Sequence, residues 1–196
     1  LFTGAEGQAP QVYDKTHLVI MGEYVPLADI FPWLRKLVPP GGDLTEGARV
    51  GIVELAGSGV KIAPLICFED SVARVVRRAA QKLPHLLVNL TNDAWFGRSA
   101  GAEQHLENAR FRAIETRLPL LRATNDGVTA LISPRGVILE QVWDSEVKSY
   151  QRPGFIFGAI DLSEPKATVY TQWGSWIVWL SMGLVFLGLI RLRNTL

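Results

Sequence analysis

The stretch VKIAPLICFEDSVARVVRRAAQKLPHLLVNL, Val60–Leu90, decides the fold of this chain. It begins with a short apolar run, VKIAPLI, and ends with a second one, HLLVNL. Between them, apolar residues recur at helical spacing in SVARVVRRAAQKL, while the basic residues fall on the remaining surface. A strand, a helix and a strand in this order predict two parallel neighbours joined by a crossover helix. We interpret the basic face as solvated, with attraction to phospholipid headgroups as the alternative.

The same pattern continues toward the C-terminus. The segment EQHLENARFRAIETR, about 103–117, predicts a second helix, and LPLLRAT predicts a strand after it. VTALISPRGVILEQV predicts a hairpin, because SPRG at 133–136 places Pro and Gly where a tight turn favours them. GFIFGAIDL, 154–162, predicts a last strand. Residues 1–165 are therefore expected to form one α/β unit.

Composition narrows the possible functions. The chain has 196 residues, enough for one domain with a full core, and a net charge of +1 gives no global electrostatic case for nucleic acid binding. A single cysteine excludes an intrachain disulfide and leaves the compartment undecided. The chain begins with Leu1 in LFTGAEGQAP, which is typical of a strand end, so we expect a fragment whose N-terminal part is missing.

A long uncharged segment, VYTQWGSWIVWLSMGLVFLGLI, covers Val169–Ile190. A helix of about 20 apolar residues is needed to cross a hydrocarbon core, and aromatic residues gather at one end of this segment like an interfacial belt. The basic sequence RLRN follows at the other end. These features predict a transmembrane helix and a short cytoplasmic basic tail over 166–196, with the preceding domain on the outer side. A buried core helix is the alternative.

Cys67 is the first candidate for chemistry. It ends the first predicted strand, and the acidic turn FED leads from it into the predicted helix. A lone cysteine after an apolar strand is usually a small buried hydrophobe. At a strand-to-helix turn, however, it projects into a cleft, and the helix N-terminus favours both a thiolate and an oxyanion formed beside it. The backbone N–H of Phe68 is then a candidate oxyanion donor.

A thiolate nucleophile needs a proton acceptor and an electrophilic partner. The three histidines, His17, His85 and His105, show no tie to Cys67 in the sequence, which disfavours a Cys-His protease. Lys15 and Glu23, within the otherwise apolar YDKTHLVIMGEYVP, offer another solution. An ammonium group beside a thiol favours the thiolate, and a carboxylate can carry a proton. A surface lysine and a surface carboxylate are the alternatives.

YDKTHL, followed some fifty residues later by ICFED, resembles the lysine and cysteine motifs of the carbon-nitrogen hydrolase (nitrilase) superfamily. Within it, HLVIMGEYVP, TNDAWFG, QHLENARFRAIETRLPLLRATNDG and the C-terminal apolar segment resemble the apolipoprotein N-acyltransferases. The resemblance covers nearly the whole chain in the right order. It implies a nitrilase-like α-β-β-α sandwich, its N-terminal part missing, followed by one C-terminal transmembrane helix.

The resemblance also implies roles for individual residues. Cys67 is the nucleophile and Lys15 the triad lysine that stabilises the oxyanion. Glu23 and Glu69 are supporting carboxylates. Trp95 and Phe96 form a loop beside the site that either contacts lipid chains or is simply pinned to the core. No metal or cofactor is implied.

Two departures from the family pattern stand out. Ile20 and Met21 replace a Pro-Phe pair with apolar residues of similar volume. The first catalytic glutamate of the family lies upstream of the lysine motif, and nothing in this chain matches it. We therefore expect the 196-residue chain alone to be inactive.

The implied activity is an N-acyltransferase of the bacterial inner membrane with a thioester ping-pong mechanism. A phospholipid is the acyl donor, and the N-terminal amine of a diacylglyceryl-cysteine lipoprotein is the acceptor. The first alternative is a membrane-tethered nitrilase-type amidase, which would use the same triad. The second is a catalytically inactive binding domain, because one triad member lies outside the chain.

Overall fold

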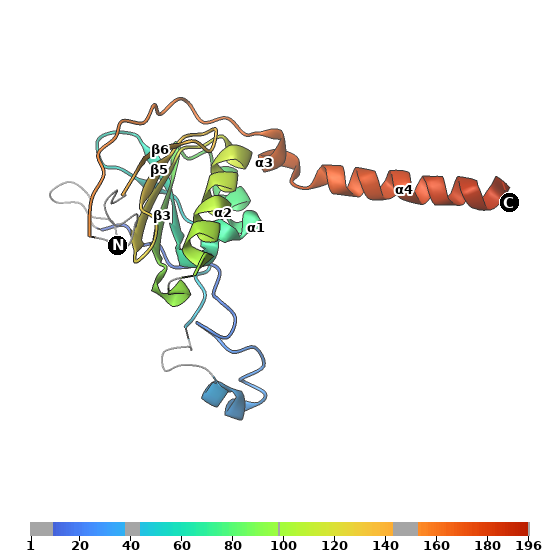
Figure 1. Ribbon diagram of the computed structural model, residues 1–196, viewed down its shortest axis with the longest axis horizontal. Coiled ribbons are helices and arrows are strands. Elements are labelled where there is room, and N and C mark those ends of the chain that lie inside the picture. The colour runs from blue at the N-terminus through green and yellow to red at the C-terminus, as the bar shows by residue number, and fades with distance from the viewer. Residues whose placement is uncertain (1–9, 38–43, 98, 143–152, 196) are drawn as a thin grey trace.

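The computed structural model describes residues 10–37, 44–97, 99–142 and 153–195. Within them, a mixed six-stranded sheet has the order β1-β2-β3-β4-β5-β6, and two helices cover one of its faces (Figure 1). The strands are β1 Val53–Glu54, β2 Lys61–Ile66, β3 Leu86–Asn92, β4 Leu120–Asn125, β5 Ala130–Ile132 and β6 Ile138–Gln141. The helices are α1 Ala73–Ala80, α2 Gly101–Thr116, α3 Val169–Trp173 and α4 Trp176–Thr195, with 3₁₀ turns η1 Pro32–Leu37, η2 Cys67–Ser71 and η3 Ala94–Phe96.

The centre of the sheet confirms the predicted α/β pattern. β2 pairs parallel with β3, and β3 pairs parallel with β4, so α1 and α2 are crossover helices. β5 and β6 form the predicted antiparallel hairpin, and its turn closes with the N–H of Gly136 donating to the carbonyl of Ser133 at 2.9 Å. Gly136 has φ +75°, a conformation that favours glycine. β1, which pairs antiparallel with β2, was not anticipated.

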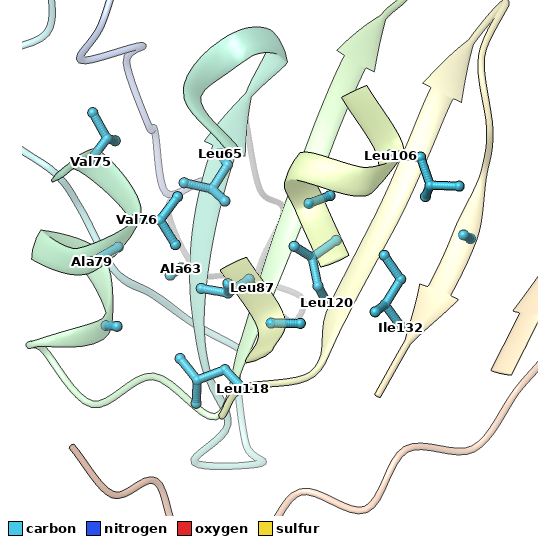
Figure 2. Close-up of a cluster of buried hydrophobic side chains, with 14 of the residues drawn as sticks. Ala63, Leu65, Val75, Val76, Ala79, Leu87, Leu106, Leu118, Leu120 and Ile132 are labelled. Carbon is cyan, nitrogen blue, oxygen red and sulfur yellow. The ribbon is translucent and has the colours of Figure 1, made fainter. Parts of the chain in front are cut away.

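The hydrophobic core lies between the sheet and the pair α1 and α2 (Figure 2). Leu65, Leu87 and Leu120 come from the three central strands and are fully buried. They pack against the apolar face of α1, where Val76 and Ala79 are also fully buried. Burying each leucine contributes about 1.5–3 kcal/mol, so this layer fixes the two helices on the sheet.

The parallel strands bring their carboxyl ends to one edge of the sheet. β2 runs directly into the turn that begins at Cys67, and β3 runs into the turn that contains Trp95. Side chains that follow neighbouring parallel strands meet at this edge, where open α/β sheets place their binding sites. The topology therefore brings the two predicted site segments together.

The strand predicted at 154–162 is wrong. The described residues from 153 to 168 run without regular secondary structure. Two glycines explain the difference: a Cβ added to Gly154 would lie 2.9 Å from the Val142 side chain, and one added to Gly158 would lie 2.4 Å from Leu131. The segment thus lays its backbone against side chains of the β5–β6 region, and the close approach uses glycine in place of ladder pairing.

The helix α3 is attached to α1 through Arg77. Arg77, on α1, donates from Nε to the carbonyl of Tyr170 at 3.1 Å and from Nη2 to the carbonyl of Gln172 at 2.6 Å. Gln81, one turn further along, donates to the carbonyl of Thr171. Part of the basic face that we interpreted as solvated therefore holds the C-terminal segment.

The helix α4 follows α3 and projects from the body of the molecule (Figure 1). Its large apolar side chains are exposed, among them Leu184 and Phe186. Among the described helices, none combines the length and hydropathy needed to cross a bilayer, so the transmembrane helix predicted over 166–196 is not confirmed.

Candidate active site

Cys67 is the first residue of η2, immediately after β2. Its backbone has φ +53°, in the left-handed region that costs a non-glycine residue on the order of 1 kcal/mol. The side chain is half-buried, and its carbonyl accepts a hydrogen bond from Asn89 Nδ2 at 3.0 Å. The sequence predicted that the FED turn runs directly into a helix, and this was wrong. Val72 has an extended backbone and separates η2 from α1. A strained, partly accessible thiol at a strand end fits a nucleophile.

Glu69, two residues after Cys67, is fully buried and connects two distant segments. Its carboxylate accepts hydrogen bonds from Tyr13 Oη at 3.0 Å, Thr16 N at 2.7 Å, Thr16 Oγ1 at 2.8 Å, His17 N at 3.1 Å and Ile66 N at 2.8 Å. Burial, together with the negative charge of Glu69, raises the pKa of Tyr13, so its hydroxyl stays a donor. The segment 13–17 is thereby fastened to the Cys67 turn.

Lys15 lies within that fastened segment. Its ammonium donates to both Glu23 oxygens at 2.6 Å, and the Lys15 side chain is only 9% exposed. Glu23 also accepts the backbone N–H of Val19 at 2.8 Å. The structure thus pairs the two charges that the sequence placed inside an apolar stretch, and a charge-assisted pair of this kind holds the ammonium in one position.

The two rings of the TNDAWFG loop have different surroundings. Phe96 is half-buried and meets the His105 ring edge to face, with 5.8 Å between the ring centroids. Trp95 is 76% exposed. Phe68, the residue after Cys67, is partly exposed, and its ring centroid lies 6.2 Å from that of the same His105 ring. One aromatic ring therefore pins the loop, while the other faces outward from it.

A buried ionic cluster beneath these segments was missed from the sequence. His105 Nε2 lies 2.6 Å from Asp70 Oδ1, and His105 Nδ1 lies 2.8 Å from Asp93 Oδ1. Arg122 donates to both carboxylates, through Nη1 to Asp70 and through Nη2 to Asp93 at 2.8 Å. All four side chains are at most 3% exposed. We call Asp70, Asp93, His105 and Arg122 the ionic cluster.

The ionic cluster shifts the pKa values of two of its members. Burial would lower the pKa of His105, but hydrogen bonds to Asp70 and Asp93 outweigh it and the net pKa is raised. Burial would raise the pKa of Asp93, but the hydrogen bond from His105 and the charge of Arg122 lower it overall. Both shifts favour the charged forms, the imidazolium of His105 and the carboxylate of Asp93.

A signal for this cluster was present in the sequence. Arg122 falls inside an apolar strand, and His105 shares the buried face of α2 with Ala102 and Ala109. Charged residues at such positions are rarely fully buried unless they are paired. Within the described part of the chain, no group of three or more His, Cys, Asp or Glu side chains is arranged to hold a metal ion.

The amino-acid sequence is similar to that of known proteins. The model of the carbon-nitrogen hydrolase family matches residues 1–168. An apolipoprotein N-acyltransferase from Geobacter metallireducens is 46% identical over 125 residues, which cover 64% of this chain and 24% of that protein. The corresponding protein from Nitrosomonas europaea is 39% identical over 185 residues, which cover 92% of this chain and 35% of that protein. The chain thus spans about a third or less of these two relatives.

Similarity to solved structures is weaker. An amidase from Nesterenkonia sp. is 20% identical, has a TM-score of 0.46, and aligns over 66% of this chain and 44% of its own.

Proposed function

Because the chain belongs to the carbon-nitrogen hydrolase family, we propose that it carries the nucleophile of an apolipoprotein N-acyltransferase. One observation supports this site most: Glu69 fastens the segment around Lys15 to the turn that presents Cys67. The family supports the cysteine chemistry, and the identity to named acyltransferases supports acyl transfer over hydrolysis.

The proposed reaction has two halves. In the first, a glutamate that the family carries upstream takes the proton of the Cys67 thiol, and the thiolate attacks the ester carbonyl of a phospholipid acyl chain. The C–O bond breaks, and the lyso-phospholipid alkoxide takes that proton from the glutamate as it leaves. In the second, the free amine of a diacylglyceryl-cysteine attacks the resulting thioester and gives up one proton to the same glutamate. The C–S bond breaks as the amide forms, and the departing Cys67 thiolate can take that proton back. A thioester suits this sequence because amines attack it readily and the thiolate is a good leaving group.

Each residue has a proposed role in these steps. The Lys15 ammonium and the backbone N–H of Phe68 stabilise the oxyanion of the tetrahedral intermediates. Glu23 holds Lys15 in place through two 2.6 Å hydrogen bonds. Glu69 supports the turn. The proton of the Cys67 thiol goes to a glutamate that the family carries upstream of the lysine motif, outside this chain.

Two surfaces fit a lipid substrate. Trp95 is exposed beside the turn and offers a large amphipathic ring to an acyl chain or a bilayer surface. α4 exposes apolar side chains along its length, and we propose that it enters the bacterial inner membrane with the sheet on the periplasmic side and the basic end cytoplasmic. Labelling Asn194→Cys with a membrane-impermeant reagent only after the cells are opened would support this topology, whereas labelling in intact spheroplasts would reject it.

The face of the sheet opposite α1 and α2 fits a second layer along β3 and β4. Val88, Leu90 and Leu121 alternate with core residues, so their side chains point away from α1 and α2, and Leu90 is 48% exposed. We propose that this face packs against the second sheet of an α-β-β-α sandwich contributed by the rest of the protein.

The decisive experiment separates acyl transfer from amide hydrolysis. The full-length protein that carries this chain is incubated with a labelled phospholipid and a diacylated lipopeptide, and in parallel with small aliphatic amides. The proposal expects label on the lipopeptide amine, no ammonia from the amides, and no transfer by Cys67→Ser. Ammonia release without acyl transfer would instead establish a nitrilase-type amidase. If the folded protein catalysed neither reaction, the remaining interpretation would be a binding domain.

A further inference from the structure

The ionic cluster lies between the two segments of the proposed site. Asp70 belongs to η2, the turn that begins at Cys67, and Asp93 immediately precedes η3, the turn that carries Trp95. His105 on α2 joins the two carboxylates, one through each ring nitrogen. Its ring also contacts Phe68 from the first turn and Phe96 from the second. One buried side chain therefore touches both segments twice.

The hydrogen bonds require a particular form of His105. An ionised carboxylate only accepts hydrogen bonds, and a neutral imidazole has a single N–H. Both ring nitrogens face carboxylate oxygens, at 2.6 Å and 2.8 Å, so both bonds form only when the ring is an imidazolium. Loss of its proton would break one of the two bonds and leave the buried cluster with a net negative charge.

A second route leads from the cluster to the nucleophile itself. Arg122 Nη1 donates to Asn89 Oδ1 at 3.4 Å, and Asn89 Nδ2 donates to the Cys67 carbonyl at 3.0 Å. Cys67 has a left-handed backbone, which persists only when its surroundings hold it. Asn89, fully buried, is the side chain that connects this strained residue to the cluster.

We propose that the ionic cluster locks the Cys67 turn to the Trp95–Phe96 loop, and that His105 is a positioning residue whose imidazolium form keeps the nucleophile in its reactive conformation. This inference rests on the proposed role of Cys67. It assigns the cluster a task beyond stability, because the same four side chains fix the residue that forms the thioester and the loop proposed to meet the acyl chain.

The groups around His105 leave it as the titrating member of the lock. From η2, Asp70 faces the ring, while the Glu69 carboxylate is engaged by Tyr13, Thr16 and His17. Asp93 faces the ring from the position between β3 and η3, and Arg122 on β4 pairs with both carboxylates.

The other packed helices contribute no charge to the ring. The buried residues of α1 are apolar. Glu115 and Arg112 lie at the opposite end of α2, where they and Arg77 interact with Tyr170. Deprotonation of His105, as the pH rises through its raised pKa, is therefore expected to loosen both segments together.

The test compares three variants in the full-length protein. His105→Gln removes the imidazolium. Asn89→Ala leaves all four charges paired but cuts the bond to the Cys67 carbonyl. His85→Gln is the matched control, because His85 accepts from the Lys61 N–H at the opposite end of the strands. Each is assayed for acyl transfer from a labelled phospholipid across pH 6–10, with thermal unfolding to show that it is folded.

For His105→Gln we expect kcat to fall by about 10-fold or more at pH 7 with KM within about twofold, and the alkaline decline of the wild-type profile to disappear. Asn89→Ala should lose kcat similarly but keep the alkaline decline, and His85→Gln should match wild type. A folded Asn89→Ala or His105→Gln with the wild-type kcat and pH profile would overturn the inference.

A readout independent of turnover separates this inference from the proposed function. Hydrogen exchange of residues 67–71 and 94–96 is followed by mass spectrometry in wild type and His105→Gln. Faster exchange in both segments at once is the expected result, and it holds even if wild type transfers no acyl group. Faster exchange in only one segment, or in neither, would show that the cluster does not lock them together.

Discussion

The Glu69 carboxylate accepts the backbone N–H of Thr16 at 2.7 Å, so the residue after Lys15 is bonded to the residue two positions after Cys67. These positions are separated by more than fifty residues of sequence. The proposed ammonium and the proposed nucleophile are therefore held by a single buried side chain. This relationship makes the site one unit, and it gives the first prediction.

Replacing Glu69 with Gln should lower both the free energy of unfolding and the rate of acyl transfer. The two carboxylate oxygens accept five hydrogen bonds, and the amide nitrogen of Gln would turn one acceptor into a donor that faces other donors. We expect the free energy of unfolding to fall by about 1–3 kcal/mol. Urea unfolding measures this, with the exposed Glu103→Gln as the control. A Glu69→Gln variant as stable as the control would show that the carboxylate does not fasten the segment.

Replacing Lys15 with Met should abolish turnover while the protein stays folded. Losing one donor to the oxyanion costs about 10²–10³ in kcat. The measurement is acyl transfer to a diacylated lipopeptide, with Lys61→Met, an exposed lysine at the start of β2, as the control. A loss smaller than about tenfold would mean that Lys15 is not part of the triad.

Trp95 and Phe96 should respond differently to substitution by Ala. Trp95 is 76% exposed, so Trp95→Ala should leave the unfolding midpoint unchanged and weaken use of a long-chain phospholipid by about tenfold through KM. Phe96 packs on His105, so Phe96→Ala, unlike Trp95→Ala, should lower the unfolding midpoint. If Trp95→Ala changes neither KM nor kcat, the ring does not contact the donor.

The ionic cluster predicts how stability varies with pH. The pKa of His105 is raised by Asp70 and Asp93, so its contribution is complete below the unfolded value of about 6.5 and is lost as the pH rises through the folded pKa. The pKa of Asp93 is lowered, so its contribution is present above about 3.9 and is lost as the pH falls through the folded pKa.

Denaturant midpoints between pH 3 and pH 10 measure both limbs of this profile. In His105→Gln the loss of stability on the alkaline side should be smaller than in wild type. An equal alkaline loss in the two proteins would assign it to another group.

The sequence predicted the centre of the fold because each element there carries its own signal. The strands β2 and β3 are continuous apolar runs, and α1 has an apolar face with buried Val75 and Val76. β1 was not predicted because a strand of two residues is too short to show a pattern of alternating apolar and polar residues. The 154–162 segment was mispredicted because its apolar residues suit a strand, while its glycines fit a close approach to side chains.

The site was predictable only in part for a related reason. Cys67 and Lys15 were found from local motifs, but their connection through Glu69 depends on tertiary packing. The ionic cluster was missed because Asp70, Asp93, His105 and Arg122 lie on four separate segments. Each charge looks unusual alone, and only the fold shows which charges neutralise one another.

The most direct test of the proposed mechanism is the mass of the peptide that contains Cys67, measured after the full-length protein is incubated with a labelled phospholipid and no acceptor. We predict a labelled thioester on Cys67, its release when a diacylated lipopeptide is added, and no adduct in Cys67→Ser. Full transferase activity in the Cys67→Ser variant, or an acyl group found on another residue, would show that Cys67 is not the nucleophile.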